Sequence, residues 1–374
     1  MSQISLPGLD WFYLADIVAM GGFFYCLPNL TRRDVFFAVT VPSGFRSTPE
    51  GRSALRIFRV WMFFHTLIAL AILGSGIWRG SLLITMAAIY WQIFGALLAF
   101  LRARKQVMPY AVAPSTAREA SLGPRAPGLL SRRLLQIGPF VILAVAAVIL
   151  ALHWQQIPAR FPDHWGLDGR PNGWATRTFM GVFGILISGA AVCVGIALLA
   201  YAVVHWSRHI NASGGEAAHE DHFRQVQLAI ILTSEYFIAL MFSWGALLPL
   251  RRLPESMPGG FGYILAGTLV YVIAILAVAV RTGQGGSNLG AGVMRAEASA
   301  APASTGAAPI GDRTPDACWK LGVFYINRDD PAVLVEKCFG FGYTLNFGNP
   351  RSWALLAAFI LVPLAVSLLI VHKH

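Results

Sequence analysis

Eight apolar runs, each about twenty residues long, constrain the fold of this chain more than any other feature of its sequence. The runs span residues 11–27, 57–78, 82–101, 134–152, 179–204, 226–250, 263–280 and 353–371. A helix rises 1.5 Å per residue, so about twenty residues cross the roughly 30 Å hydrocarbon core of a bilayer. The sequence therefore predicts an all-α membrane protein, a polytopic bundle of about eight transmembrane helices whose main solvent is the lipid bilayer.

The composition agrees with a membrane protein. Of the 374 residues, 56% are hydrophobic and only 13% are charged, whereas about one-quarter of the residues in soluble proteins are charged. The net charge of +11 does not indicate a nucleic-acid partner, because the basic residues flank the apolar runs instead of gathering on one compact domain. Residues 1–10 lack the basic flank and cleavage site of a signal peptide, so the first run is expected to be a retained helix.

The basic residues also predict the orientation of the bundle. When the 29 Lys and Arg residues are assigned to alternate loops, 22 fall on one side and the other 7 on the opposite side. Because positive loops stay in the cytoplasm, we expect a bacterial inner-membrane protein with both termini outside and the 281–351 loop inside. The short connection at Arg79 and Gly80 is the weak point of this assignment, since a kink there would join two spans into one.

The order of these runs and loops predicts five segments. Residues 281–315 are rich in Gly, Ala, Ser and Thr and bury too little apolar surface to offset chain entropy, which is typical of a flexible linker. The four cysteines show no Cys-x-x-Cys spacing and predict no disulfide framework. The segments are an N-terminal region of three helices (1–133), a central membrane domain with an outward loop at 153–177 (134–280), the linker (281–315), a small cytoplasmic α+β unit (316–350) and the last helix (351–374).

The outward loop has the composition of a segment that holds one shape. Its prolines restrict the backbone, and its Asp-Gly and Asn-Gly pairs are typical of tight turns. Its aromatic side chains suit contact with a partner. The candidate contact residues are Pro158, Pro162, His164, Trp165, Gly169 and Trp174.

The pattern P-x3-P-x-H-W-G-x2-G-x-P-N-G-W over residues 158–174 resembles the signature of a widespread uncharacterised bacterial membrane domain. That domain also occurs in the immunity protein that protects spore-forming bacteria from the sporulation-delaying toxin. In that relative the membrane protein confers toxin resistance and sequesters a cytoplasmic repressor. The resemblance therefore implies toxin immunity or sensing, with an external peptide toxin or envelope component and a cytoplasmic protein as partners.

Two other interpretations of the outward loop stay open. Its Pro, Gly and Trp residues are also suited to capping a helix bundle at the membrane surface without binding anything. A metal site is the second interpretation, because His153, Asp163, His164 and Asp168 offer imidazole and carboxylate ligands. These four residues lack helical ligand spacing, and we predict no metal and no cofactor.

The last cytoplasmic segment, residues 319–350, changes its hydrophobic period twice. We expect a strand at 323–326, a short helix beginning at Asp330 and Pro331, and a second strand at 342–347. Because a segment this short does not form an independent hydrophobic core, we expect the unit to dock onto the bundle. It resembles a second uncharacterised bacterial segment, matched most clearly at Trp319, Tyr325, Asn327, Asp330, Gly342 and Asn346. The Gly340-x-Gly342 pair lacks the rest of a dinucleotide or phosphate-loop motif and is interpreted as turn glycines.

Glu235 is the most unusual residue of the apolar runs, since it lies about 14 Å into the sixth of them. A carboxylate inside the membrane is costly and marks a functional-site hypothesis. Its possible companions are Asp16, His65 and Gln92 in the first three runs. Such a group either fixes helix packing as a buried polar cluster or serves a proton- or solute-coupled transporter.

The chain lacks nucleophile elbows, His-Glu-x-x-His helices and paired catalytic carboxylates, so we predict no enzyme. Arg32, Arg33 and Arg46 flank residues 36–45, which are expected to lie on anionic lipid or simply to carry stop-transfer charge. The leading hypothesis is a toxin-immunity or envelope-sensing protein without catalytic chemistry. The alternatives are a transporter that uses Glu235 and a membrane assembly partner.

Overall fold

The computed structural model describes residues 7–32, 34–42, 44–114, 133–165, 171–207, 215–251, 261–284 and 314–371. A long helix lies at each of the eight predicted spans: α1 (Pro7–Cys26), α2 (Pro49–Arg79), α3 (Leu82–Val107), α4 (Arg133–Leu152), α5 (Phe179–His205), α6 (Gly215–Leu247), α7 (Phe261–Thr282) and α9 (Pro350–Val371). In the described residues seven helices are long and apolar enough to cross a membrane, and α9 adds a shorter apolar helix at Pro350–Ala365. The predicted fold class, an all-α multi-pass membrane protein, is confirmed.

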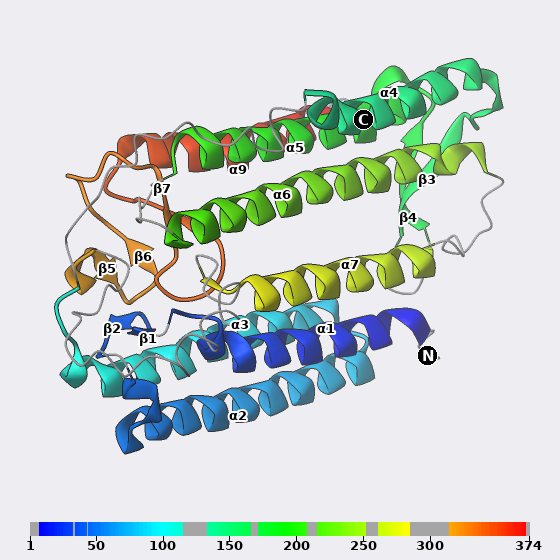
Figure 1. The fold of residues 1–374 in the computed structure, drawn as a ribbon. Helices are drawn as coiled ribbons and strands as arrows, with labels where there is room; N and C mark the ends of the chain where they lie inside the picture. The colour runs from blue at the N-terminus through cyan, green and yellow to red at the C-terminus, as the bar shows by residue number, and fades with distance from the viewer. Residues whose placement is uncertain are drawn as a thin grey trace.

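The helices lie roughly along one direction and form two groups (Figure 1). In one group α1, α2 and α3 pack together, and in the other α4, α5, α6 and α9 do so. Helix α7 contacts α1 of the first group and α6 of the second. On the α6 side, the Tyr271 hydroxyl lies 2.8 Å from Ser234 Oγ, and its ring stacks on Phe237 with 4.8 Å between ring centroids. Helix α7 therefore links the two groups within the membrane.

Helices α2 and α3 are two separate spans joined by a tight turn. Helix α2 begins with Pro49 after Thr48, whose Oγ1 accepts a hydrogen bond from the Gly51 N–H at 3.1 Å. It ends at Gly80, which has a φ of 59°, a conformation that glycine adopts without strain. The chain then reverses, and α3 packs antiparallel against α2 (Figure 1). The connection at Arg79 and Gly80, which the sequence allowed to be a turn or a kink, is therefore a turn.

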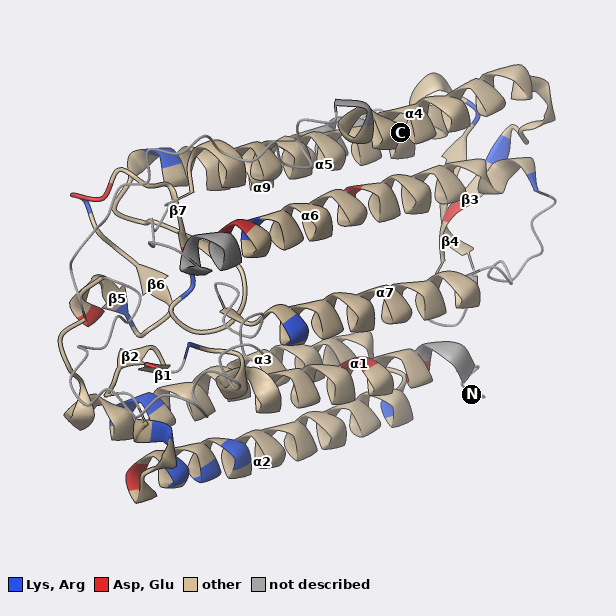
Figure 2. Cartoon of the chain, in the orientation of Figure 1, with Lys and Arg blue, Asp and Glu red and all other residues tan. Residues whose placement is uncertain are grey.

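In the residues that the structure describes, four antiparallel strand pairs lie at the two ends of the bundle (Figure 1). At one end β3 (Arg160–Trp165) pairs with β4 (Pro171–Thr176). The opposite end holds β1 (Val35–Phe36) with β2 (Val39–Thr40), β5 (Trp319–Lys320) with β6 (Phe324–Tyr325), and β7 (Leu334–Glu336) with β8 (Tyr343–Leu345). Figure 2 shows that most of the coloured Lys and Arg residues gather at this second end, which we call the basic end.

The prediction of a short helix that begins at Asp330 is wrong. In residues 314–349 the only described helical turn is the 3-10 turn Asp316–Cys318, and the expected helix region contains β7 instead. The Asp330 carboxylate accepts hydrogen bonds from the Ala332 N–H at 3.0 Å and the Tyr325 hydroxyl at 2.9 Å, which holds a turn at this point. The apolar residues 333–335 that follow are buried and suit a strand.

Residues 36–41 and Phe45 are buried in the protein, so the expectation that this segment lies on anionic lipid is wrong for them. Strands β1 and β2 form a hairpin whose turn residues, Phe37 and Ala38, are fully buried. Phe37 packs against Phe58 of α2 and Phe100 of α3, with ring centroids 5.1 and 6.3 Å apart. These apolar residues form part of the core because the helix ends and the β5–β8 unit (residues 314–349) enclose them together.

Candidate functional site

The β3–β4 hairpin has one face fixed against the bundle. Phe161 pairs with Ala175, and both are buried, at 3% and 2% exposure. They join Ile157 and side chains of α4, α5 and α6 in one hydrophobic cluster. The register of the hairpin is therefore set by its inward-facing residues, since a shift by one residue would turn these side chains away from the cluster.

The other face of the hairpin presents a basic and aromatic surface. The Arg160 guanidinium lies over the Trp174 ring, 5.1 Å from its centroid, and Trp174 is 49% exposed. His164 is also exposed, and its Nδ1 atom hydrogen-bonds to Asn172 Oδ1 across the hairpin. We call the three exposed residues Arg160, His164 and Trp174 the hairpin surface, although His164 lies past a bulge and pairs with Gly173 instead of lying beside Trp174. Two of its members were predicted from sequence, whereas Arg160 was missed because only the strand register brings it onto Trp174.

Several contacts hold the hairpin rigidly in place. Arg177 donates hydrogen bonds from its guanidinium to the Ile157 and Gln155 carbonyls at 3.0 and 3.3 Å, tying the end of β4 to the segment before β3. Gly173 is required for close approach, since a Cβ atom there would lie 2.7 Å from His164 Cβ. Asn172 and Gly173, which the sequence suggested as a tight turn, lie within β4, and Asp168 and Gly169 lie outside the described residues. The contacts of Arg177 and Gly173 give the hairpin surface a fixed geometry.

The remaining predicted loop residues are less directly involved. Pro158 is exposed and precedes β3, while Pro162 pairs with Trp174. Trp165 is half-buried, and its indole N–H has no partner among the described residues. Gly169 lies outside the described residues. In the described parts of the chain no group of three His, Cys, Asp or Glu residues is arranged to hold a metal ion.

At the basic end, five of the six residues predicted for the cytoplasmic unit lie in one buried network around Asn346. The Asn346 side chain donates hydrogen bonds to the carbonyls of Asn327 at 2.8 Å and Asp330 at 3.0 Å, and accepts one from the Asn327 N–H at 3.0 Å. The Trp319 ring packs on Tyr325 with centroids 5.0 Å apart. The sixth residue, Gly342, has a φ of 98° and allows the turn into β8. These residues therefore build the unit.

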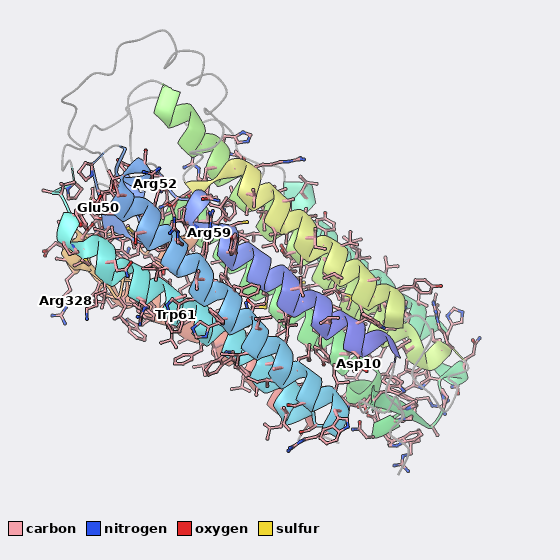
Figure 3. The ribbon with its side chains drawn as sticks, turned by 90° about the horizontal axis from the view of Figure 1, so that it is seen from below. Asp10, Glu50, Arg52, Arg59, Trp61 and Arg328 are labelled. Atoms are coloured by element: carbon pink, nitrogen blue, oxygen red, sulfur yellow. The ribbon has the colours of Figure 1, made fainter. Side chains whose placement is uncertain are left out.

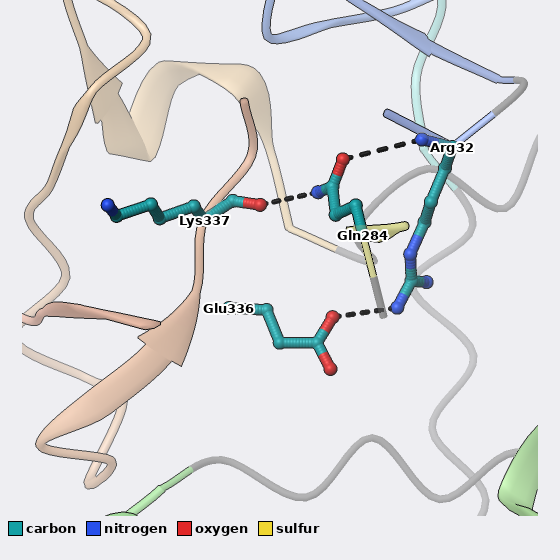
Figure 4. Close-up of polar contacts among 4 residues, drawn as sticks. All are labelled: Arg32, Gln284, Glu336 and Lys337. Carbon is teal, nitrogen blue, oxygen red and sulfur yellow. Dashed lines mark hydrogen bonds and ion pairs between the residues drawn. The ribbon is translucent and has the colours of Figure 1, made fainter. Parts of the chain in front are cut away.

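A second set of polar contacts ties the β5–β8 unit to the bundle (Figure 4). Arg32, which follows α1, forms an ion pair of 2.8 Å with Glu336 of β7. Gln284, just after α7, accepts from the Arg32 N–H at 3.3 Å and donates to the Lys337 carbonyl. Burial lowers the pKa of the Lys337 ammonium group. Gln284 was missed in the sequence because it begins the segment that was interpreted wholly as a linker.

The β5–β8 unit docks on both helix groups, as its small size predicted. Its residues Trp319, Tyr325 and Val335 share a hydrophobic cluster with β1, β2, α2 and α3. Leu334 shares another cluster with α5 and α6, and its N–H donates to the Trp206 carbonyl at 3.1 Å. The unit therefore bridges the two groups at the basic end.

The polar residues inside the membrane do not meet in one site. Glu235 of α6 is 3% exposed, and the Cys193 thiol of α5 lies 4.0 Å from the Glu235 backbone carbonyl. His65 of α2 packs against Trp91 of α3, with ring centroids 5.8 Å apart, and Asp16 lies on α1. Glu235 therefore belongs to one helix group, and Asp16 and His65 to the other.

Comparison with known families gave two partial matches. Residues 141–188, which contain most of α4, the β3–β4 hairpin and the start of α5, match a domain of unknown function, DUF1648. Residues 328–353, which contain β7 and β8, match a family of unknown function, DUF5808. Neither the curated proteins nor the solved structures that were compared gave a match. The chain is thus a multi-pass membrane protein in which two segments, one at each end of the bundle, resemble domains of unknown function.

Proposed function

We propose that this chain is an envelope-sensing or toxin-immunity protein of a bacterial inner membrane, whose hairpin surface binds an external peptide or envelope component. The observation that carries the proposal is the rigid hairpin that exposes Arg160, His164 and Trp174 while its opposite face is locked into the bundle. The uneven distribution of Lys and Arg supports an orientation with this hairpin outside and the basic end in the cytoplasm (Figure 2). The proposed role requires no catalytic step and no cofactor.

The chemistry of the hairpin surface suits a peptide ligand. Exposed tryptophan and arginine are the side chains that most often dominate binding at protein interfaces. Because the strand pairing and the Arg177 contacts already fix their geometry, little conformational entropy is lost when a ligand binds. A ligand with apolar side chains and acidic or carbonyl groups would complement the Trp174 ring and the Arg160 guanidinium.

The β5–β8 unit is suited to the cytoplasmic side of this role. It contacts both helix groups, so a shift of one group against the other would change its position. The unit also exposes apolar side chains on the β5–β6 hairpin, including Leu321 at 56% and Phe324 at 47%. Such a patch supports binding of a cytoplasmic protein partner.

Trp174→Ala is expected to weaken protection against the matching toxin at least about tenfold, because truncation of a central interface tryptophan costs 2 kcal/mol or more. The measurement is a challenge of a deletion strain with a panel of envelope-active peptides, after complementation with the wild-type chain or the variant. Trp78→Ala is the matched control, because Trp78 is 76% exposed near the end of α2. Full protection by Trp174→Ala at equal membrane levels would contradict the proposal.

A transporter organised around Glu235 is the second candidate. It rests on the Glu235 Oε1 atom, which is buried and has no hydrogen-bond partner among the described residues. Glu235→Gln is expected to abolish proton-dependent solute flux in reconstituted vesicles, because the amide cannot exchange a proton, whereas Asp221→Asn at the start of α6 should leave it intact. Wild-type flux in the Glu235→Gln vesicles would remove this candidate.

A further inference from the structure

A cavity of about 590 Å³ opens between the end of α1 and the first turns of α2 at the basic end. Three of its lining residues are arginines and the others are apolar or aromatic. Among the described residues no carboxylate lines it. The lining residues are Tyr25, Arg52, Leu55, Arg56, Arg59, Val60, Phe63 and Phe64.

The three arginines lie on one face of α2, because positions 52, 56 and 59 are four and three residues apart. Figure 3 shows Arg52 and Arg59 in the part of α2 nearest its N-terminus. In the described parts of the chain none of the three forms an ion pair, and the buried Arg59 Nε atom has no hydrogen-bond partner. The Arg59 guanidinium lies 5.0 Å from the centroid of the Tyr25 ring. Three like charges gathered in one cavity favour an anion.

The apolar part of the cavity lies farther along α2, toward the middle of the membrane. Val60, Phe63 and Phe64 are 46%, 60% and 53% exposed; Val60 directly follows Arg59, and the two phenylalanines follow it by about one turn. The arginines therefore lie where the headgroup of a phospholipid would lie, and the apolar side chains lie where its acyl chains would lie. A free phosphate ion would need the arginines but would gain nothing from the apolar wall.

We propose that this cavity binds one anionic phospholipid. Its phosphate would accept hydrogen bonds from Arg52, Arg56 and Arg59, and one acyl chain would lie along Val60, Phe63 and Phe64. Guanidinium groups bind phosphate oxygens with two parallel hydrogen bonds, which makes the site more selective than the general attraction of a basic surface to anionic lipid. The inference does not depend on the proposed function of the hairpin.

The test compares lipid retention by the purified full-length chain in a neutral detergent, measured by native mass spectrometry during titration with phosphatidylglycerol or phosphatidylcholine. The wild-type chain should retain one phosphatidylglycerol molecule in a saturable way and phosphatidylcholine at least about tenfold more weakly. The double variant Arg56→Gln/Arg59→Gln should lose this preference. The control Lys105→Gln/Arg351→Gln removes the same charge from two exposed residues that do not line the cavity and should keep it.

A second variant separates a lipid site from a phosphate site and leaves the arginines intact. Phe63→Ser/Phe64→Ser should weaken phosphatidylglycerol retention, while millimolar inorganic phosphate should not displace the lipid from the wild-type chain. The proposal is overturned if the arginine variant retains phosphatidylglycerol as the wild type does, or if the control loses it equally. It is also overturned if phosphate alone occupies the cavity and the phenylalanine variant behaves as the wild type.

Discussion

Replacing Asn346 with alanine is expected to destabilise the β5–β8 unit by about 3 kcal/mol. The Asn346 side chain, which is fully buried, donates to the carbonyls of Asn327, Asp330 and Ala332 and accepts from the N–H groups of Asn327 and Gly348. Alanine removes the Asn346 partner of these buried and partly buried backbone groups, although the Ala332 carbonyl keeps a second donor, Asn349 Nδ2 at 3.5 Å. Each such buried group costs about 1–3 kcal/mol, although local relaxation recovers part of this.

The reactivity of Cys338 measures this effect, because its thiol is fully buried between the unit and the bundle. A loss of about 3 kcal/mol raises the population of the open unit by roughly 100-fold, and maleimide labelling of Cys338 should accelerate accordingly. Asn172→Ala, at an exposed position at the other end of the bundle, should leave the labelling rate unchanged. An unchanged rate in Asn346→Ala would show that the network does not hold the unit together.

Phe37→Ala is expected to detach the β5–β8 unit from the helices, with a loss of stability of about 3 kcal/mol. The Phe37 ring is fully buried, stacks on Phe339 of the unit at 5.8 Å between centroids, and lies 5.1 Å from the Phe58 ring of α2. The Phe37 backbone has a left-handed conformation with a φ of 47°, in which a residue other than glycine is strained. The Arg104 guanidinium of α3 donates to its carbonyl at 3.1 Å. The ring therefore supplies the packing that keeps this turn in place.

Limited trypsin digestion in native membranes measures the detachment, because Lys320 and Arg328 offer cleavage sites within the unit. Cleavage at these sites should be much faster in Phe37→Ala than in the wild-type chain. Phe94→Ala is the matched control, since Phe94 is 51% exposed on the lipid-facing side of α3. If both variants are cleaved at the same rate, the Phe37 ring does not anchor the unit.

The helices were predictable because lipid imposes a simple rule on the sequence. A span needs about twenty apolar residues, and the chain contains a helix at each of the eight runs. The extended backbone around Pro162 was also indicated, since proline and its neighbours favour extended conformations, but Asn172 and Gly173, expected to form a turn, lie within strand β4. The contact of Arg160 with Trp174 was not indicated, because it depends on the strand register, in which Arg160 pairs with Thr176 and Pro162 pairs with Trp174.

The basic end was less predictable because its structure depends on contacts between distant segments. The β1–β2 turn has Phe37 and Ala38 at positions where sequence rules favour Asn-Gly, so it did not resemble a hairpin. Strands of two or three residues, such as β7, carry too little periodicity to be distinguished from a helix start. Likewise, the sequence gives the depth of Glu235 in its span, but it does not show to which helix group Glu235 belongs.

We propose that the bundle separates the hairpin surface, outside the cell, from the β5–β8 unit, inside it. Paired cysteine labelling tests this most directly, with Trp174→Cys in the hairpin and Lys320→Cys in the exposed part of the unit. A membrane-impermeant maleimide applied to intact spheroplasts should label position 174 and should label position 320 only after permeabilisation, with each site identified by peptide mass. Labelling of position 320 in intact spheroplasts, with position 174 protected, would contradict the claim.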